Sequence, residues 1–149
     1  MTTHSGLDRS MERGSYGFLR SVMKLDAAAT GAVGVLMLLA AGTVIGVQRP
    51  FVLLLGVPPV PLASAGAFLI VYAAFAWFVG SRRRVNGPAA WAAVWINAAY
   101  AAGCVVAAAA GLFQLTALGV AFVLAQALAV ALFAALQILG LRRGRRTAG

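Results

Sequence analysis

Four long stretches of the chain consist almost entirely of apolar residues, and polar residues gather between them. The first stretch, residues 25–47, contains a single charge, Asp26, close to its start. About 20 apolar residues, rising 1.5 Å each, are enough to cross a hydrocarbon core of about 30 Å. The pattern therefore predicts an all-α membrane protein with transmembrane helices over about residues 18–47, 62–81, 88–110 and 115–141.

The segments between these stretches indicate how the helices connect. Four prolines interrupt residues 48–61, so we predict an apolar loop or a short interfacial segment there. Pro88 suits the first turn of the third helix. Because the other connections are short, neighbouring helices should pack antiparallel in an up-down-up-down four-helix bundle.

The two ends of the chain are polar and flank a transmembrane domain of residues 18–141. Residues 1–17 mix small polar residues with both signs of charge, which predicts a disordered cytoplasmic tail. Residues 142–149 form a basic cytoplasmic tail. We expect no cleaved signal peptide, because more than 20 mostly polar residues precede the first apolar stretch.

Composition and charge support a membrane location. The chain is 62% hydrophobic and 10% charged, far more apolar than a soluble domain. Its 12 Lys and Arg against 3 acidic residues would favour nucleic acid on a soluble surface, but they lie outside the apolar stretches, so no nucleic-acid partner is expected. In the predicted topology, all the Lys and Arg residues except Arg49 fall on one side of the membrane. The positive-inside rule therefore places both termini in the cytoplasm, for a multi-pass protein of the cytoplasmic (inner) membrane.

The two halves of the chain resemble each other. The second and fourth helices end alike, in Gly80-Ser81-Arg82-Arg83 and Gly140-Leu141-Arg142-Arg143, and the first and third helices align so that Asp26 corresponds to Asn97. Two helices per half would give a 2+2 parallel internal repeat. The alignment also moves the start of the first helix back to Phe18, which puts Asp26 about one turn inside the membrane, level with Asn97 and Gln137.

Polar side chains within the predicted helices form a candidate intramembrane site. Its members are Asp26, Thr30, Asn97, Tyr100 and Gln137, with Trp77 at the same level of the second helix. Ionisable and amide side chains in a membrane face the protein interior and commonly mark a functional site. They also have a structural explanation, because a helix dipole and nearby arginines (Arg82–Arg84, Arg142, Arg143) can neutralise an acid and amides can join helices. Two further residues, Tyr72 and Gln126, either extend a polar path or satisfy local partners.

Small residues at helical spacing predict close helix contacts. Gly42 and Gly46 form a GxxxG pattern, and Ala99, Gly103, Ala107 and Gly111 form a second ridge. Such ridges allow helices to approach closely, either within the bundle or in a homodimer.

The sequence offers little for catalysis. One histidine and one cysteine, His4 and Cys104, exclude a clustered metal site, and no cofactor motif, hydrolase motif or phosphate-binding loop is present. General acid–base chemistry would depend on Asp26 alone. We therefore expect no enzymatic activity.

Short motifs in the helices resemble a known group of proteins. These motifs are Leu25-Asp26-Ala27, Asn97, and Ala135-Leu136-Gln137 before Gly140-Leu141-Arg142-Arg143. They resemble small four-helix integral membrane proteins that are common in high-GC bacteria and lack an assigned function. The resemblance covers most of residues 18–143 and implies the same bundle topology, without implying an activity.

Three functional hypotheses follow. The first is a non-catalytic accessory or scaffold membrane subunit, alone, as a homodimer or with another membrane subunit. The alternative is a small proton- or cation-coupled transporter that uses Asp26; small multidrug-resistance transporters are similar in having four helices and one acid in the first, although theirs is a glutamate. A lipid-modifying or lipid-binding protein is the third. The expected partners are the bilayer itself and its anionic headgroups, contacted through Arg82, Arg83, Arg84, Arg142 and Arg143.

Overall fold

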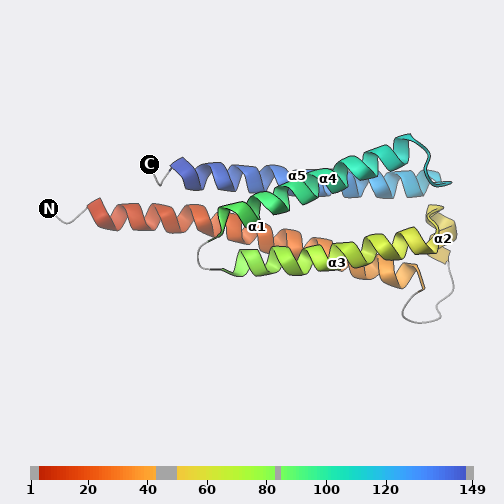
Figure 1. The fold of residues 1–149 in the computed structure, drawn as a ribbon, viewed down its shortest axis with the longest axis horizontal. Coiled ribbons are helices and arrows are strands. Elements are labelled where there is room, and N and C mark those ends of the chain that lie inside the picture. The colour runs from red at the N-terminus through yellow and green to blue at the C-terminus, as the bar shows by residue number, and fades with distance from the viewer. Residues whose placement is uncertain (1–3, 43–49, 83–84, 147–149) are drawn as a thin grey trace.

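The protein is a bundle of long helices. The computed structural model describes residues 4–42, 50–82 and 85–146, and this part of the chain contains helices α1 (His4–Ala40), α2 (Pro50–Leu55), α3 (Pro59–Ser81), α4 (Gly87–Ala109) and α5 (Ala117–Arg146). The four long helices lie along one axis, and the short α2 lies at the end of the bundle opposite to the two chain termini (Figure 1).

The four long helices have the length and composition of membrane spans. The apolar segments are Gly17–Ala40, Pro59–Ser81, Gly87–Ala109 and Ala117–Gly144. Large apolar side chains cover the outside of the bundle, including Val71 and Leu128, which are 70% and 73% exposed. Such a surface matches a lipid environment, where the outside of a bundle is as apolar as its interior. The predicted all-α, four-helix bundle with antiparallel neighbours is therefore confirmed.

The first helix differs from its predicted range of 18–47 at both ends. It begins at His4, because a segment without proline can extend an existing helix at no nucleation cost. It ends at Ala40, and Gly42 adopts a φ of +73°, the left-handed conformation that commonly terminates helices at glycine. Gly46, the second residue of the predicted GxxxG pattern, lies outside the described residues.

The proline-rich connection contains the short helix α2, and its position at a membrane interface stays a prediction. The Leu55 carbonyl accepts a hydrogen bond from the Thr116 amide at 3.2 Å, and the Thr116 hydroxyl donates to the Leu54 carbonyl at 2.5 Å. A side chain at Gly119 would overlap the Leu55 carbonyl. This close approach fixes α2 against the first turn of α5.

Small residues decide which helices pack most tightly. The most extensive interface joins α1 to α3, followed by α4 with α5 and α1 with α5, whereas α3 and α4 touch little. At the α1–α3 contact, a Cβ at Gly34 or Gly66 would lie 2.8 Å from the carbonyl oxygen of the other. The predicted ridge on α4 is not used in this way. A Cβ at Gly103 or Gly111 would meet no atom within 4 Å, because α4 diverges from α3 along this stretch.

The two halves do not pack symmetrically, although the sequence repeat itself stays a prediction. Gly80 of α3 and Gly140 of α5 are equivalent in the predicted repeat. A Cβ at Gly80 would meet the side chain of Met23, and one at Gly140 would meet that of Leu19, so both glycines face α1. Symmetric halves would instead bring Gly140 against α4. Helix α1 is therefore the common partner of α3 and α5.

Candidate functional site

Asp26 is a hydrogen-bonding centre on which all four long helices converge. Its carboxylate is fully buried. Oδ1 accepts a hydrogen bond from the Thr30 hydroxyl at 3.0 Å. Oδ2 accepts three more, from the Tyr72 hydroxyl at 2.6 Å, the Asn97 amide at 3.0 Å and the Gln137 amide at 2.8 Å. These five residues, here named the Asp26 cluster, come from α1, α3, α4 and α5.

The antiparallel arrangement of the helices places these side chains at one depth. Asp26, Tyr72, Asn97 and Gln137 each lie between seven and ten residues from the end of their apolar segment that is nearer the chain termini. At 1.5 Å per residue this corresponds to about 10 to 15 Å along the helix axis. The four side chains therefore share one level of the bundle. Thr30 follows Asp26 by one helical turn and so shares its face.

The carboxylate is held by neutral groups. All four donors are uncharged, and the structure shows no ion pair to Asp26 within its described residues. Burying a carboxylate costs several kcal/mol. Four hydrogen bonds to a charged acceptor, each contributing about 1.5–3 kcal/mol, are of the right size to offset that cost.

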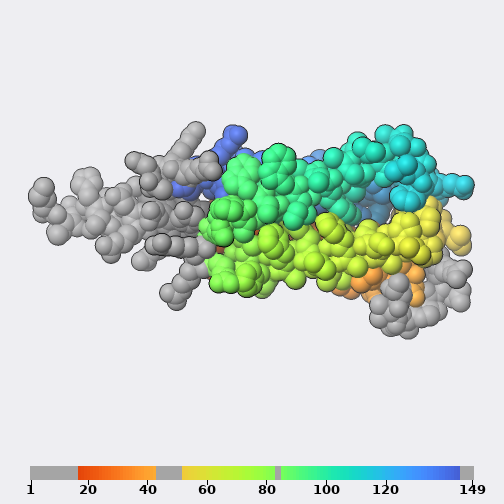
Figure 2. All heavy atoms as spheres, viewed as in Figure 1, coloured from red at the N-terminus to blue at the C-terminus, as the bar shows by residue number. Residues whose placement is uncertain are grey.

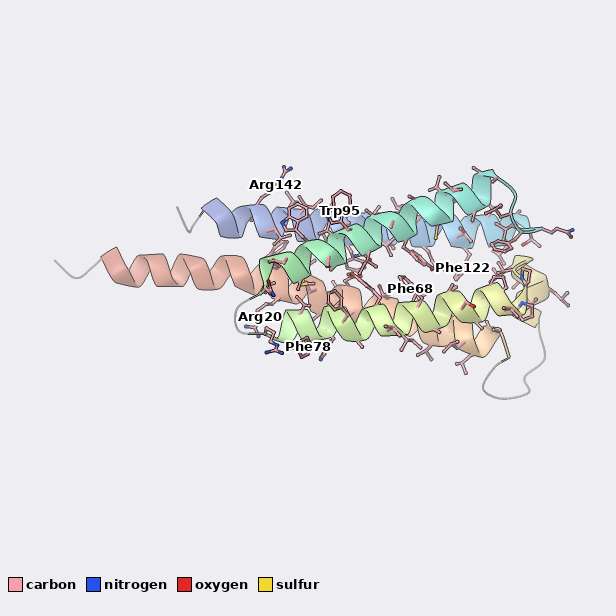
Figure 3. All side chains as sticks on the ribbon, viewed as in Figure 1. Arg20, Phe68, Phe78, Trp95, Phe122 and Arg142 are labelled. Atoms are coloured by element: carbon pink, nitrogen blue, oxygen red, sulfur yellow. The ribbon has the colours of Figure 1, made fainter. Side chains whose placement is uncertain are left out.

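The described basic side chains near this end of the bundle contact other groups. The Arg20 guanidinium donates to the Gly80 carbonyl at 3.2 Å, Arg82 lies 4.2 Å from the ring centre of Phe78, and Arg143 lies 5.3 Å from that of Phe18. Arg20 and Phe78 lie at the same end of the bundle (Figure 3). Neutralisation of Asp26 by Arg82 or Arg143, which the sequence allowed, is therefore not the arrangement in the structure. Arg83 and Arg84 lie outside the described residues.

One polar atom of the cluster is left without a partner. Gln137 is fully buried, its amide nitrogen donates to Asp26, and its Oε1 has no hydrogen-bond partner among the described residues. An unpaired buried acceptor costs about 1–3 kcal/mol. The cluster therefore contains a spare acceptor next to its only ionisable carboxyl group.

The structure brings together four of the five predicted site residues, namely Asp26, Thr30, Asn97 and Gln137. Tyr100 is not part of the cluster, because its hydroxyl donates to the Gln126 Oε1 at 3.0 Å. Trp77 is half-exposed, and its ring lies 5.5 Å from the Lys24 ammonium. The member of the cluster that comes from α3 is Tyr72, which the sequence did not assign to the site. Tyr72 could have been identified from its position on the buried face of α3. Tyr72, Ala76 and Val79 all face inward, whereas Trp77 faces outward.

Two cavities lie between the cluster and α2. The larger has a volume of about 280 Å³ and the smaller about 60 Å³. Gln126 lines both, and Thr30 of the Asp26 cluster lines the smaller one. Polar side chains thus extend from Asp26 through Thr30 to Gln126 and Tyr100, where Phe68 stacks on the Tyr100 ring with the ring centres 6.1 Å apart. Phe122 is partly buried at this level of the bundle, whereas Phe68 is 47% exposed (Figure 3).

The described residues include no group of three or more His, Cys, Asp or Glu side chains that could hold a metal ion. No protein-family model, curated protein or solved structure matches this chain. The site must therefore be interpreted from its own geometry.

Proposed function

We propose that this integral membrane four-helix protein is a non-catalytic accessory or scaffold subunit. The observation that carries the proposal is the Asp26 cluster, in which one enclosed carboxylate takes a hydrogen bond from every long helix. No face of Asp26 is open to a substrate. The polar groups are used to hold four weakly amphipathic helices in a single arrangement, which is a common role of buried polar side chains between membrane helices.

The surfaces around the bundle fit such a role. With both termini in the cytoplasm, Arg82, Arg142 and Arg143 would lie at the cytoplasmic membrane surface, where cationic side chains attract anionic headgroups. Arg83 and Arg84 would add to this charge. The exposed small residues Ala99 and Gly103 of α4 offer a face for a second copy or another membrane subunit.

Substitutions within the cluster test the proposal. The variants Asp26→Asn and Asn97→Ala should insert into membranes and retain any cellular phenotype, because a scaffold needs the bundle and not the charge. Insertion is measured by membrane fractionation and folding by thermal melting. An ion or solute flux that either substitution abolishes, in protein that remains folded, would contradict the scaffold function.

A second candidate function is proton- or cation-coupled transport through Asp26. Two observations favour it: the buried carboxylate has only neutral described partners, and Gln137 Oε1 is an unused acceptor beside it. If Asp26 takes up a proton, its new O–H group needs an acceptor, and rotation of the Gln137 amide would provide Oε1 in place of the amide N–H. A transporter needs a group that is stable in both its charged and neutral forms.

Transport is tested in proteoliposomes that contain a pH-sensitive dye. An imposed gradient should move protons, or drive uptake of a cation or drug, with the unmodified protein and not with Asp26→Asn. Absence of uptake across a broad panel of cations and lipophilic drugs would remove this candidate and leave the scaffold function.

A further inference from the structure

The larger cavity has the features of a ligand site that is separate from the Asp26 cluster. It lies near α2, between α1, α3, α4 and α5, and its wall includes Met37, Leu62, Tyr100, Cys104, Phe122 and Gln126. We name it the α2-side cavity. Figure 2 views the bundle onto the furrow between α3 and α4, which leads toward this region.

Small side chains and the divergence of α4 create the space. Ala65 of α3 and Gly103 and Ala107 of α4 line the cavity, and a Cβ at Gly103 would meet no atom within 4 Å. The helices α3 and α4 also make few contacts with each other. The cavity is not enclosed: Gly103 in its wall is exposed, so the space of about 280 Å³ opens between the helices to the surroundings of the bundle.

The polar side chains in the cavity wall are Tyr100, Cys104 and Gln126. The Tyr100 hydroxyl already donates a hydrogen bond to the Gln126 Oε1, at 3.0 Å. The Gln126 amide nitrogen carries two N–H groups, yet its partner is the Met37 sulfur at 3.9 Å. A thioether is a weak acceptor. Gln126 thus has donor capacity at the wall of a cavity whose lining contains no Lys, Arg, Asp or Glu.

The volume sets the size of the molecule that fits. An apolar cavity of about 150 Å³ holds one benzene molecule, which has six carbon atoms. A cavity of about 280 Å³ is nearly twice as large. By that scale it accommodates roughly 10 to 13 non-hydrogen atoms, the size of a substituted bicyclic ring.

We propose that the α2-side cavity binds an uncharged, mostly apolar molecule of this size whose carbonyl or ether oxygen accepts a hydrogen bond from Gln126. This function goes beyond the scaffold and transport proposals and does not depend on Asp26. The lipid bilayer supplies such molecules at high local concentration, since apolar compounds partition into it. The acceptor distinguishes the ligand from a lipid acyl tail, which fills apolar space but carries no oxygen along its chain.

The test compares two probes of the same shape, 1-acetylnaphthalene and 1-isopropenylnaphthalene, which differ in having C=O or C=CH₂. Their binding to the protein in lipid nanodiscs is measured by equilibrium dialysis, and uptake by empty nanodiscs is subtracted. The ketone should bind about 2- to 12-fold more tightly, the range that one hydrogen bond provides. In Gln126→Leu this preference should fall to about one, because the donor is gone.

Three further variants complete the design. Gly103→Leu and Ala65→Leu fill the cavity from α4 and from α3, and each should weaken binding of both probes at least 10-fold. If one of these two variants melts at a lower temperature than the unmodified protein, probe binding to the other variant tests whether the cavity is the binding site. Gln114→Leu, outside the cavity lining in the exposed α4–α5 connection, should keep the full preference for the ketone.

Three results would overturn the proposal. The first is binding no greater than that of empty nanodiscs. The second is equal affinity for the two probes in the unmodified protein, which would mean a cavity that any acyl tail can fill. The third is a ketone preference that survives in Gln126→Leu, since the donor would then lie elsewhere. None of these results depends on whether the protein transports ions.

Discussion

Replacing Tyr72 by Phe is the cleanest perturbation of the Asp26 cluster. The substitution removes one hydroxyl, which donates to the Asp26 Oδ2 at 2.6 Å, and leaves the buried ring in place. Hydrogen bonds between membrane helices contribute about 0.6 kcal/mol on average and up to about 1.7 kcal/mol. Bonds to a charged acceptor contribute about 1.5–3 kcal/mol. Because this bond is short and its acceptor is charged, we expect Tyr72→Phe to lower the free energy of unfolding by about 1–2 kcal/mol.

A double-mutant cycle separates this bond from other effects of the substitution. The protein is unfolded reversibly in mixed micelles by increasing the fraction of denaturing detergent, and the fluorescence of its three tryptophans reports the folded fraction. Tyr72→Phe is measured alone and together with Asp26→Leu, which removes the acceptor. The second measurement should show almost no cost for losing the hydroxyl, so the coupling energy should be at least about 1 kcal/mol.

Tyr100→Phe is the matched control for this cycle. Its hydroxyl donates to Gln126 and not to Asp26, so its cost should be the same with and without Asp26→Leu. The reasoning is refuted if Tyr72→Phe costs the same in both backgrounds, because the hydroxyl would then have a partner other than Asp26.

Three other predictions concern packing, charge and orientation. Gly34→Ala should destabilise the bundle by about 1–3 kcal/mol, because its Cβ would meet the opposing carbonyl, whereas Gly103→Ala should change stability by less than about 0.5 kcal/mol in the same unfolding assay. Asp26→Asn should cost less than about 1 kcal/mol, since its one oxygen can still accept from Tyr72, Asn97 and Gln137 while the Thr30 hydroxyl rotates to accept from its Nδ2, and Asp26→Leu should cost about 3 kcal/mol by leaving the donors unpaired; equal costs would mean that the donors do not depend on this acceptor. In a cysteine-free background, Leu112→Cys should react with an impermeant maleimide added outside intact cells and Arg82→Cys only after lysis; the reverse pattern would contradict the cytoplasmic placement of the termini.

Most of the fold could be predicted because a membrane imposes a simple requirement on each helix. Apolar runs of sufficient length identified α1, α3, α4 and α5, and prolines identified the interruption that contains α2. The end of α1 could not be placed, since hydropathy continues through Val47 and the helix stops where Gly42 adopts a left-handed conformation. A backbone turn of this kind leaves little trace in a sequence rich in glycine.

The candidate site was predictable in part, because buried polar residues in membrane helices seek one another. Alignment of the two halves placed Asp26 level with Asn97, and the two side chains do share a hydrogen bond. The same alignment favoured Trp77, which faces outward, over Tyr72, whose position on the buried face of α3 was the better guide. The contact between Gly34 and Gly66 was missed because many pairs of small residues in this chain have similar spacing. The larger cavity depends on the divergence of α4 from α3, which no residue pattern encodes.

The convergence of the helices on Asp26 is tested most directly by solid-state NMR of the protein in lipid. The chain contains two aspartates and two asparagines, so selective labelling of Asp side-chain carboxyl groups with ¹³C and Asn side chains with ¹⁵N gives an almost unambiguous pair. The bond from Asn97 to Asp26 is 3.0 Å between nitrogen and oxygen. Such a bond places the nitrogen about 3.8 Å from the carboxyl carbon. The structure predicts dipolar dephasing of the Asp26 carbon at that distance, lost in Asn97→Ala, and an Asp26 carbon that shows no dephasing would contradict the convergence.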